Sequence, residues 1–409
     1  MNWKLDPQSK PKKYQIAGDG HYVNGDYENC VVCYKQAAEF YLATGQFLKA
    51  KDCYAILASL FAEKDRKLDI TLRHSVADAI FKEALKFESQ ERLVEAETLF
   101  RCVLDLKDDR LINIALWYLG RVLAEAGKFL DAVDVMDQYY SKVKRMEMEK
   151  NKKEFPSSRL DATRCGIPAI LFIAQIKSAS EYITAILKKT FQISAYYNLS
   201  IETFPNDYLI PSALCPIAEG GNIARLHADA NDHNLSLLER LGINKLMIHV
   251  RDPRQATISW LHYVIKRSDD YINTARLLYT PPIPKNFLSM SFNEKLEWAI
   301  EFYYPGVISW INGWMELEKE NHQNFQLKYT TFEEFANNPA SFLQNMALFF
   351  GICHDQIPET VLSYSKETTS NFRKGLTDEW KTVYTSKQLD YMWSLMPKFM
   401  ATRFNWKEH

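Results

Sequence analysis

The sequence predicts an α/β protein in two parts: an all-α region over residues 1–155 and a parallel sheet flanked by helices over residues 156–409. Three observations support this prediction. Apolar residues in the first part recur at intervals of three and four, the helical period, and strand signals are nearly absent there. In the second part, short apolar runs alternate with helical patterns, which is typical of a parallel sheet covered on both faces. Between them, the stretch 141–159 is charged and ends in proline and serine, so we place the domain boundary near Phe155.

The composition is that of an ordinary soluble chain with balanced charge. The 409 residues are 47% hydrophobic, and 50 basic and 51 acidic side chains give a net charge of −1. This balance argues against nucleic acid or an anionic membrane surface as the main partner, but it permits a small anion in a local basic pocket. Neither a secretory segment nor a membrane-spanning run is present, so we expect a cytoplasmic protein. The seven cysteines include a single CxxC, Cys30 to Cys33, and no metal is expected.

Three segments of the first part share a skeleton, in which a large apolar residue is followed by alanine three positions later and by another large apolar residue four positions after that. The segments are GQFLKAKDCYAIL, ERLVEAETLFRCV and GKFLDAVDVMDQY, with Ala50, Ala96 and Ala132 at the shared position. Small residues let two helices approach closely, and the pattern resembles tetratricopeptide-type helical hairpins. The alanines lie 46 and 36 residues apart. Because this spacing is irregular, an ordinary helical bundle is the competing interpretation.

Three basic elements of the second part lie where parallel sheets bind ligands, beyond the carboxyl ends of strands. The apolar run AILFIAQ leads to Lys177 and small residues where a helix begins, so free N–H groups and an ammonium can receive an anion. The run KLMIHV leads to Arg251, and Ser259 follows on the helix that Pro253 begins. The third element is the basic loop at 373–375. Taken singly, each is equally well explained as a solvated cap, a surface ion pair or a basic turn.

In this order, the three elements resemble the sulfotransferases that use 3′-phosphoadenosine-5′-phosphosulfate (PAPS). IKSASEY resembles the 5′-phosphosulfate loop PKSGTTW, RDPRQATIS resembles the 3′-phosphate motif RxPxxxxxS, and FRKGLTDEWK resembles RKGxxGxWK. The stretch from SWINGW to FANNP resembles the family's tryptophan-rich helix, the strand after it and the segment YEDMxxNP. The resemblance covers residues 156 to the C-terminus. It implies a sulfotransferase fold with a P-loop-like phosphosulfate-binding loop and PAPS as co-substrate, without a metal.

The resemblance also implies a role for each matching residue. Lys177 would contact the 5′-phosphate and the leaving oxygen, and Arg251 with Ser259 would hold the 3′-phosphate. His227, in ARLHADA, stands where the family has its catalytic base. The catalytic side chains implied are therefore His227, Lys177 and Ser259. The further cofactor-binding residues implied are Ser178, Ala179, Ser180, Glu181, Arg373, Lys374 and Gly375, with Tyr182 and Phe332 against the adenine.

Three departures from the family pattern matter: two lie in the first loop, and the turn after His227 lacks its usual proline. Ala179 replaces a glycine, and Glu181 replaces a threonine. A carboxylate beside a phosphate is repulsive unless it is neutralised, so Glu181 is either a second candidate base, a structural residue or a disabling one. The competing function is therefore a non-catalytic helical-repeat interaction protein with a degenerate sulfotransferase fold. A nucleotide kinase is disfavoured because no Walker sequence is present.

The acceptor and the oligomeric state are left open by the sequence. Residues 268–292, rich in aromatics and prolines, lie where the family has its variable substrate loops. A small-molecule acceptor and a carrier- or protein-borne acceptor are both compatible with the helical first part, and O-sulfation is not distinguished from N-sulfation. The segment KTVYTSKQLD matches the family's dimer motif KxxxTVxxxE only in part. A homodimer therefore stays an open alternative.

Overall fold

The computed structural model divides the chain into two units, Met1–Val143 and Lys144–His409. The structure describes residues 9–62, 69–154 (side chains to 142), 166–191, 193–197, 199–267, 281–320, 324–352 and 376–408. The domain boundary expected near Phe155 lies outside the described residues.

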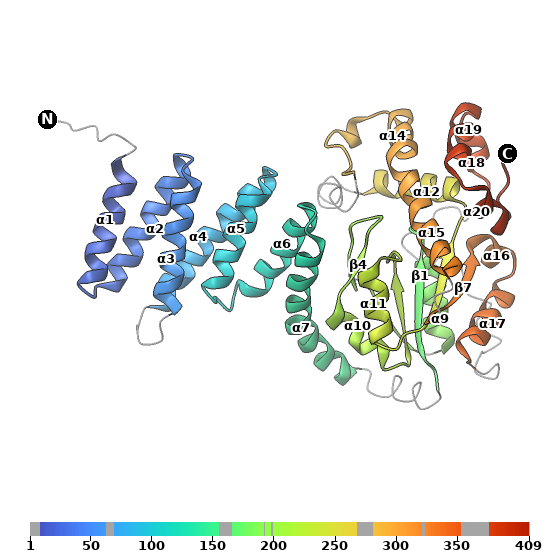
Figure 1. Cartoon of the computed structure of the whole chain (residues 1–409), viewed down its shortest axis with the longest axis horizontal. Helices are drawn as coiled ribbons and strands as arrows, with labels where there is room; N and C mark the ends of the chain where they lie inside the picture. Colours follow the sequence, from blue (N-terminus) through green and yellow to red (C-terminus); the bar gives the residue numbers. More distant parts are fainter. Residues whose placement is uncertain are drawn as a thin grey trace. The chain divides into compact units, whose positions relative to one another are not determined.

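The first unit is helical throughout its described residues (Figure 1). Its helices are α1 (Ser9–Val23), α2 (Tyr27–Ala43), α3 (Phe47–Ala62), α4 (Ile70–Ser89), α5 (Leu93–Asp105), α6 (Ile112–Glu125) and the first part of α7 (Phe129–Glu154). Helices adjacent in sequence pack against each other, namely α1 with α2, α2 with α3, α4 with α5 and α5 with α6. The all-α prediction for this region is confirmed.

The same tight turn joins four pairs of consecutive helices in the first unit. In each turn one residue has a left-handed backbone, and the next N–H donates to the carbonyl five residues back, which satisfies an otherwise unpaired helix-end carbonyl. The left-handed residues are Gly25, Gly45, Glu91 and Gly127, with φ of 71°, 74°, 60° and 74°. Glycine adopts this conformation without strain, whereas Glu91 bears a cost of about 1–2 kcal/mol.

After each of these turns, a fully buried small residue lies in the first turn of the new helix. These residues are Cys30, Ala50, Ala96 and Ala132. The structure thus adds a fourth copy of the skeleton, GDYENC, in which cysteine replaces alanine. Cys30 of the CxxC is therefore a packing residue. The described part of the first unit is helical, and its assignment to tetratricopeptide-type hairpin repeats stays a prediction.

The second unit contains a five-stranded parallel sheet flanked by helices, in the order β2-β5-β1-β6-β7 (Figure 1). Its strands are β1 (Ala169–Ala174), β2 (Ser194–Tyr196), β5 (Asn222–Leu226), β6 (Lys245–Val250) and β7 (Gln326–Thr331). Strands β3 (Ser200–Ile201) and β4 (Tyr208–Leu209) form a separate antiparallel pair. The apolar runs predicted as strands are β1, β6 and β7, so this part of the fold prediction is confirmed.

Helices follow the strands as the sequence pattern predicts. They are α9 (Ser180–Phe191), α10 (Pro211–Ala218), α11 (Asp232–Arg240), α12 (Pro253–Lys266), α14 (Phe292–Trp298), α15 (Tyr304–Lys319), α16 (Phe332–Asn337), α17 (Pro339–Phe350), α18 (Trp380–Val383), α19 (Ser386–Leu395) and α20 (Lys398–Arg403). Apolar residues of α9 and α17, including Ile183 and Met346, pack on Phe172 of β1 and Met247 of β6. This buried layer holds β1 and β6 against α9 and α17, and so positions the carboxyl ends of these two strands. None of the described helices has the length and apolar character that crossing a membrane requires.

The start of α12 is tied to the C-terminal part of the second unit through Arg254. Its side chain is fully buried and donates two hydrogen bonds to the Asp252 carboxylate, at 3.0 and 2.8 Å. It also donates to the carbonyls of Lys407 (2.6 Å) and Glu408 (2.8 Å), and its guanidinium lies 3.7 Å from the centroid of the Trp380 ring. A buried charge requires this degree of compensation, so Arg254 serves to hold the C-terminal segment.

Candidate active site at the carboxyl ends of the strands

The candidate site is built on the loop between β1 and α9. Lys177 and Ala179 in this loop have left-handed backbones, with φ of 67° and 65°. Between them, the buried Ser178 donates from its Oγ to the carbonyl of Gln175 at 2.7 Å. Two L-residues in this conformation cost about 1–2 kcal/mol each, so the surrounding contacts must hold the loop in place. Ala179 thus keeps the backbone conformation that glycine favours, although a Cβ is present.

Arg251 at the end of β6 connects this loop to the third basic element. Its Nη1 donates to the carbonyl of Lys177 at 3.0 Å, and its Nη2 donates to the carbonyl of Leu376. The guanidinium lies 4.1 Å from the centroid of the Phe332 ring, and both residues are 5% exposed. Leu376 directly follows Arg373, Lys374 and Gly375, which lie outside the described residues. The structure therefore brings together the loop, the strand-end arginine and Leu376, the residue that follows the predicted basic loop.

Helix α12 presents a polar face toward the same loop. The Asp252 side chain caps its N-terminus, and Pro253 occupies the first turn, as the sequence predicts. Ser259 lies one turn before Tyr263, so both are on one face of the helix. The Lys177 ammonium lies 4.2 Å from the centroid of the Tyr263 ring, which is close enough for a cation–π interaction.

His249 of β6, a buried histidine that was not predicted from the sequence, binds the backbone of the β1–α9 loop. The His249 ring is fully buried, with Nε2 3.0 Å from the carbonyl of Ser178 and Nδ1 2.9 Å from Oγ1 of Thr330. Because a carbonyl only accepts, Nε2 carries the proton and Nδ1 accepts from Thr330. Burial lowers the pKa of His249 to about 3, so the ring is neutral. In the sequence this histidine looks like one more member of an apolar strand.

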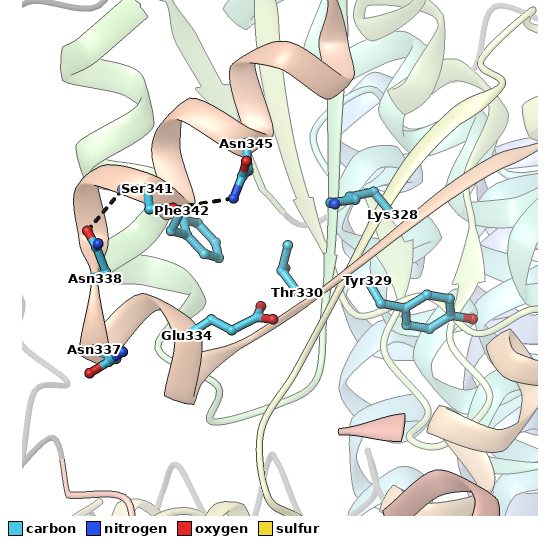
Figure 2. A pocket seen from close by; sticks show the side chains of 9 residues that line it. All are labelled: Lys328, Tyr329, Thr330, Glu334, Asn337, Asn338, Ser341, Phe342 and Asn345. Carbon is cyan, nitrogen blue, oxygen red and sulfur yellow. Dashed lines mark hydrogen bonds between the residues drawn. The ribbon is translucent and has the colours of Figure 1, made fainter. Parts of the chain in front are cut away.

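Thr330 also borders a cavity of about 370 Å³ between β7, α16 and α17 (Figure 2). The cavity is lined by Lys328, Tyr329, Thr330, Glu334, Asn337, Asn338, Ser341, Phe342 and Asn345. The Lys328 and Glu334 side chains enter it from β7 and α16 (Figure 2). Of the predicted site residues that the structure describes, none lines this cavity.

The predicted base, His227, lies just after β5 with both ring nitrogens engaged. Its Nδ1 is 2.6 Å from the carbonyl of Ala174, so Nδ1 carries the proton and Nε2 holds the lone pair. Nη1 of Arg225 lies 3.2 Å from Nε2 and donates to it. Burial, and next the charges of Arg225 and Lys177, lower the pKa of His227 to about 3. The ring is therefore neutral, as a general base must be.

The turn that carries His227 is fixed by the tryptophan-rich helix. Nε1 of Trp310 donates to the carbonyls of His227 and Ala228, at 2.9 and 3.0 Å. Nε1 of Trp314 donates to Ala228 at 3.2 Å. These indoles lie one turn apart on α15, so a single helix face determines where the histidine backbone lies.

Arg225 is the second residue that the sequence analysis missed. Its Nη1 lies 3.4 Å from Oγ of Ser180, and its guanidinium lies 5.1 Å from the centroid of the Tyr197 ring. Side chains alternate along a strand, so the pattern R-L-H predicts that Arg225 and His227 share one side of β5. That period of two is the signal that identifies it. Together with Lys177 and Arg251, it makes three cations around one loop.

The acidic residue nearest the base in sequence contributes little fixed charge. Burial raises the pKa of Asp229 to about 7, although Nδ2 of Asn231 donates to its carboxyl group at 2.6 Å. Burial also raises the pKa of Asp207 well above its usual range. Burial thus disfavours the charged form of both carboxyl groups.

The two predicted adenine-binding aromatics and Glu181 lie near the loop in different settings. Tyr182 meets Phe335 edge-on, with ring centroids 5.8 Å apart. Phe332 packs under Arg251, as described above, and Glu181 lies in the first turn of α9. The structure thus places the described predicted residues on the elements that surround the β1–α9 loop.

No protein-family model matches the sequence, and no curated protein matches it. Among solved structures, the chain is similar to mouse sulfotransferase SULT7A1 complexed with PAP, with 16% sequence identity and a TM-score of 0.39. The alignment covers 58% of this chain and 87% of that chain. At this TM-score the likeness carries no argument about function.

Proposed function

We propose that the protein is a PAPS-dependent sulfotransferase that transfers a sulfuryl group to a hydroxyl or amine acceptor. One observation carries the proposal: the Arg251 guanidinium binds the carbonyl of Lys177 and that of Leu376. This side chain connects the β1–α9 loop to Leu376, which directly follows the predicted basic loop at 373–375 in the sequence. A ligand with anionic groups at two separate positions, such as a 3′,5′-bisphosphorylated nucleoside, matches such an arrangement.

The residues around the loop supply donors suited to PAPS. The Lys177 ammonium and the N-terminus of α9 would receive the 5′-phosphosulfate, because the first N–H groups of a helix have no partner inside it. Arg251 and Ser259, with Arg373, Lys374 and Gly375, would hold the 3′-phosphate. Among the described residues no cluster of acidic, histidine or cysteine side chains is suited to a metal ion.

The proposed reaction is an in-line displacement at sulfur. The acceptor oxygen or nitrogen forms a bond to sulfur while its proton moves to Nε2 of His227. The bond from sulfur to the 5′-phosphate oxygen breaks, and its electron pair stays on the released 3′-phosphoadenosine-5′-phosphate (PAP). Lys177 stabilises the charge that grows on that oxygen. The helical first unit, if tetratricopeptide-like, would present a carrier- or protein-borne acceptor, and a free small molecule is the alternative.

Calorimetric titration with PAP and AMP tests the nucleotide preference, since the two differ only in the 3′-phosphate. We expect PAP to bind at least about tenfold more tightly than AMP, and Arg251→Met to remove most of that difference. Arg240→Met is the matched control, because Arg240 is an exposed arginine on α11. Equal affinities of the unmodified protein for PAP and AMP would contradict the proposal. Transfer from labelled PAPS to pooled acceptors then tests catalysis.

One observation favours the non-catalytic alternative: both ring nitrogens of His227 are engaged, Nδ1 by a carbonyl and Nε2 by Arg225. A scaffold that keeps a nucleotide-binding fold would bind PAP and transfer no label to any acceptor. The double variant Lys177→Ala, His227→Ala separates the two functions. A sulfotransferase loses its turnover in that variant, whereas a scaffold has none to lose.

A further inference from the structure

The His227 ring is in a state that does not yet permit base catalysis. A neutral imidazole has one lone pair, and here it lies on Nε2 because Nδ1 donates to Ala174. That lone pair accepts a hydrogen bond from Nη1 of Arg225 at 3.2 Å. An acceptor hydroxyl can transfer its proton to Nε2 only after the guanidinium has moved away.

The charge of Arg225 acts on the Glu202 carboxyl, but the hydrogen bonds of the guanidinium are incomplete. Its Nε is buried and has no hydrogen-bond acceptor in the part of the chain that the structure describes. Its contact with Oγ of Ser180 is 3.4 Å long, and a neutral imidazole is a weak acceptor for a charged donor. An oxygen of an anion would be a stronger partner, because charge-assisted hydrogen bonds are about twice as strong as neutral ones. Ser180 is the first residue of α9, so the guanidinium already reaches the place where the loop would receive an anion.

We propose that Arg225 is a positioning residue: it donates to Nε2 of His227 and exchanges this partner for an oxygen of a sulfate-class anion when one binds at the β1–α9 loop. The exchange frees the lone pair only when the anion is present. The use of the freed lone pair in sulfuryl transfer rests on the proposed function, but the exchange itself does not. As a consequence of the exchange, the His227 lone pair becomes available only after the sulfuryl donor PAPS has bound. Until then the lone pair is covered by Arg225.

The charged groups that act on the His227 ring are Arg225 from β5 and Lys177 from the loop. The other elements against it contribute uncharged contacts: the carbonyl of Ala174 in β1 binds the ring, and the indoles of α15 bind the backbone. Movement of Arg225 toward an anion removes a donor and a nearby positive charge from Nε2. Proton uptake by His227 then becomes easier, so its titration reports the position of Arg225.

Histidine side-chain NMR on the full chain measures this directly. With ¹⁵N-labelled histidine, the His227 signal is assigned by its loss in His227→Gln, and its titration midpoint is followed with sulfate or with chloride at equal ionic strength. In the unmodified protein we expect sulfate, but not chloride, to raise the midpoint by about one pH unit. In Arg225→Gln the midpoint should already be raised and should no longer respond to sulfate. Arg240→Gln is the matched control and should behave like the unmodified protein.

Two results would overturn the inference: equal midpoints in the unmodified protein and Arg225→Gln, or an equal response of both to sulfate. If Arg225→Gln does not fold, Arg225→Lys replaces it, because lysine keeps the positive charge. We expect the His227 midpoint of Arg225→Lys to lie between those of the unmodified protein and Arg225→Gln. Failure of PAP to bind, with the sulfate response intact, would refute the proposed function and leave the exchange standing. Binding of PAP without any change in the His227 midpoint would refute the exchange and leave the proposed function standing.

Discussion

Left-handed residues occur in both units of the molecule, but different side chains occupy them. In the hairpin turns of the first unit, three of the four positions are glycine, and the turn only ends one helix and begins the next. In the β1–α9 loop of the second unit, the two positions are Lys177 and Ala179. Where a turn is purely structural, glycine minimises the strain. Glu91 and Lys107 of the first unit are also left-handed without being glycine, so strain alone does not indicate function. Lys177 is a candidate because the strained residue also carries an ammonium beside the Tyr263 ring at the carboxyl end of β1.

The largest effect that this comparison predicts is on activity. Lys177→Gly relieves the left-handed strain but removes the ammonium, so we expect sulfuryl transfer from labelled PAPS to fall about 100-fold or more. Its free energy of unfolding should change by less than about 1 kcal/mol, since relief of strain offsets the lost contact with Tyr263. Activity assays and urea denaturation of the same preparation measure the two. Loss of several kcal/mol in stability would instead make Lys177 a structural residue.

The second prediction concerns His249, which holds the carbonyl between the two strained residues. Its pKa is about 3 in the folded protein and about 6.5 in the unfolded chain, so below pH 6.5 the unfolded state binds more protons. This contribution to stability is therefore present above pH 6.5 and is lost as the pH falls. Between pH 7 and pH 5 we expect a loss of about 2 kcal/mol from this residue.

The measurement is urea denaturation of the second unit as a function of pH, with His249→Gln as the comparison. Glutamine can still donate to the carbonyl of Ser178 but does not titrate in this range. The pH dependence should be shallower in the variant by the stated amount. Parallel pH profiles of the two proteins would show that His249 can be protonated in place.

The third prediction tests the structural turns. A Cβ at Gly45 would meet no atom within 4 Å, so Gly45→Ala adds only backbone strain at φ 74°. We expect a loss of about 1 kcal/mol in the stability of the first unit, measured by thermal and urea unfolding, with no change in transfer activity. An alanine at Gly20, inside α1 and also in open space, is the control and should not destabilise.

The smallest effects come from relieving strain where the side chain has no proposed role. Ala179→Gly and Glu91→Gly should each stabilise the protein by up to about 1 kcal/mol, because the left-handed cost exceeds the added flexibility of the unfolded chain. Transfer activity should be retained in both. A large drop in the activity of Ala179→Gly would mean that the Ala179 methyl group, as well as Lys177, is required by the site.

The sequence predicts the parts of the fold that depend on long periodic patterns. The helices of the first unit follow the helical period, and the strands β1 and β6 are continuous apolar runs that are almost wholly buried, whereas β7 is a more alternating segment. Strand β5 was missed because Asn222 and Arg225 interrupt its apolar run. Strands β2, β3 and β4 were not predicted because each has only two or three residues, too few to show the alternation of a strand. The left-handed backbone of Lys177 was also unpredictable, since no glycine marks it.

The candidate site shows the same limit. Lys177 and Arg251 were indicated because each follows an apolar run predicted as a strand, whereas His227 was implied by the resemblance to the family. The hydrogen bonds between them depend on which strands are neighbours. Arg225 and His249 act across β1, which lies between β5 and β6, and strand order is not encoded in any local stretch of sequence. Residues that act across strands therefore required the structure.

The hydrogen bonds from Arg254 to the carbonyls of Lys407 and Glu408 bear on how the protein is made on the ribosome. The hairpins of the first unit have local contacts and can form while the rest of the chain is being synthesised. The start of α12 cannot be completed until residues 407 and 408 have left the exit tunnel, because the buried guanidinium lacks two of its partners before then. We therefore expect the second unit to complete its folding later in synthesis than the first.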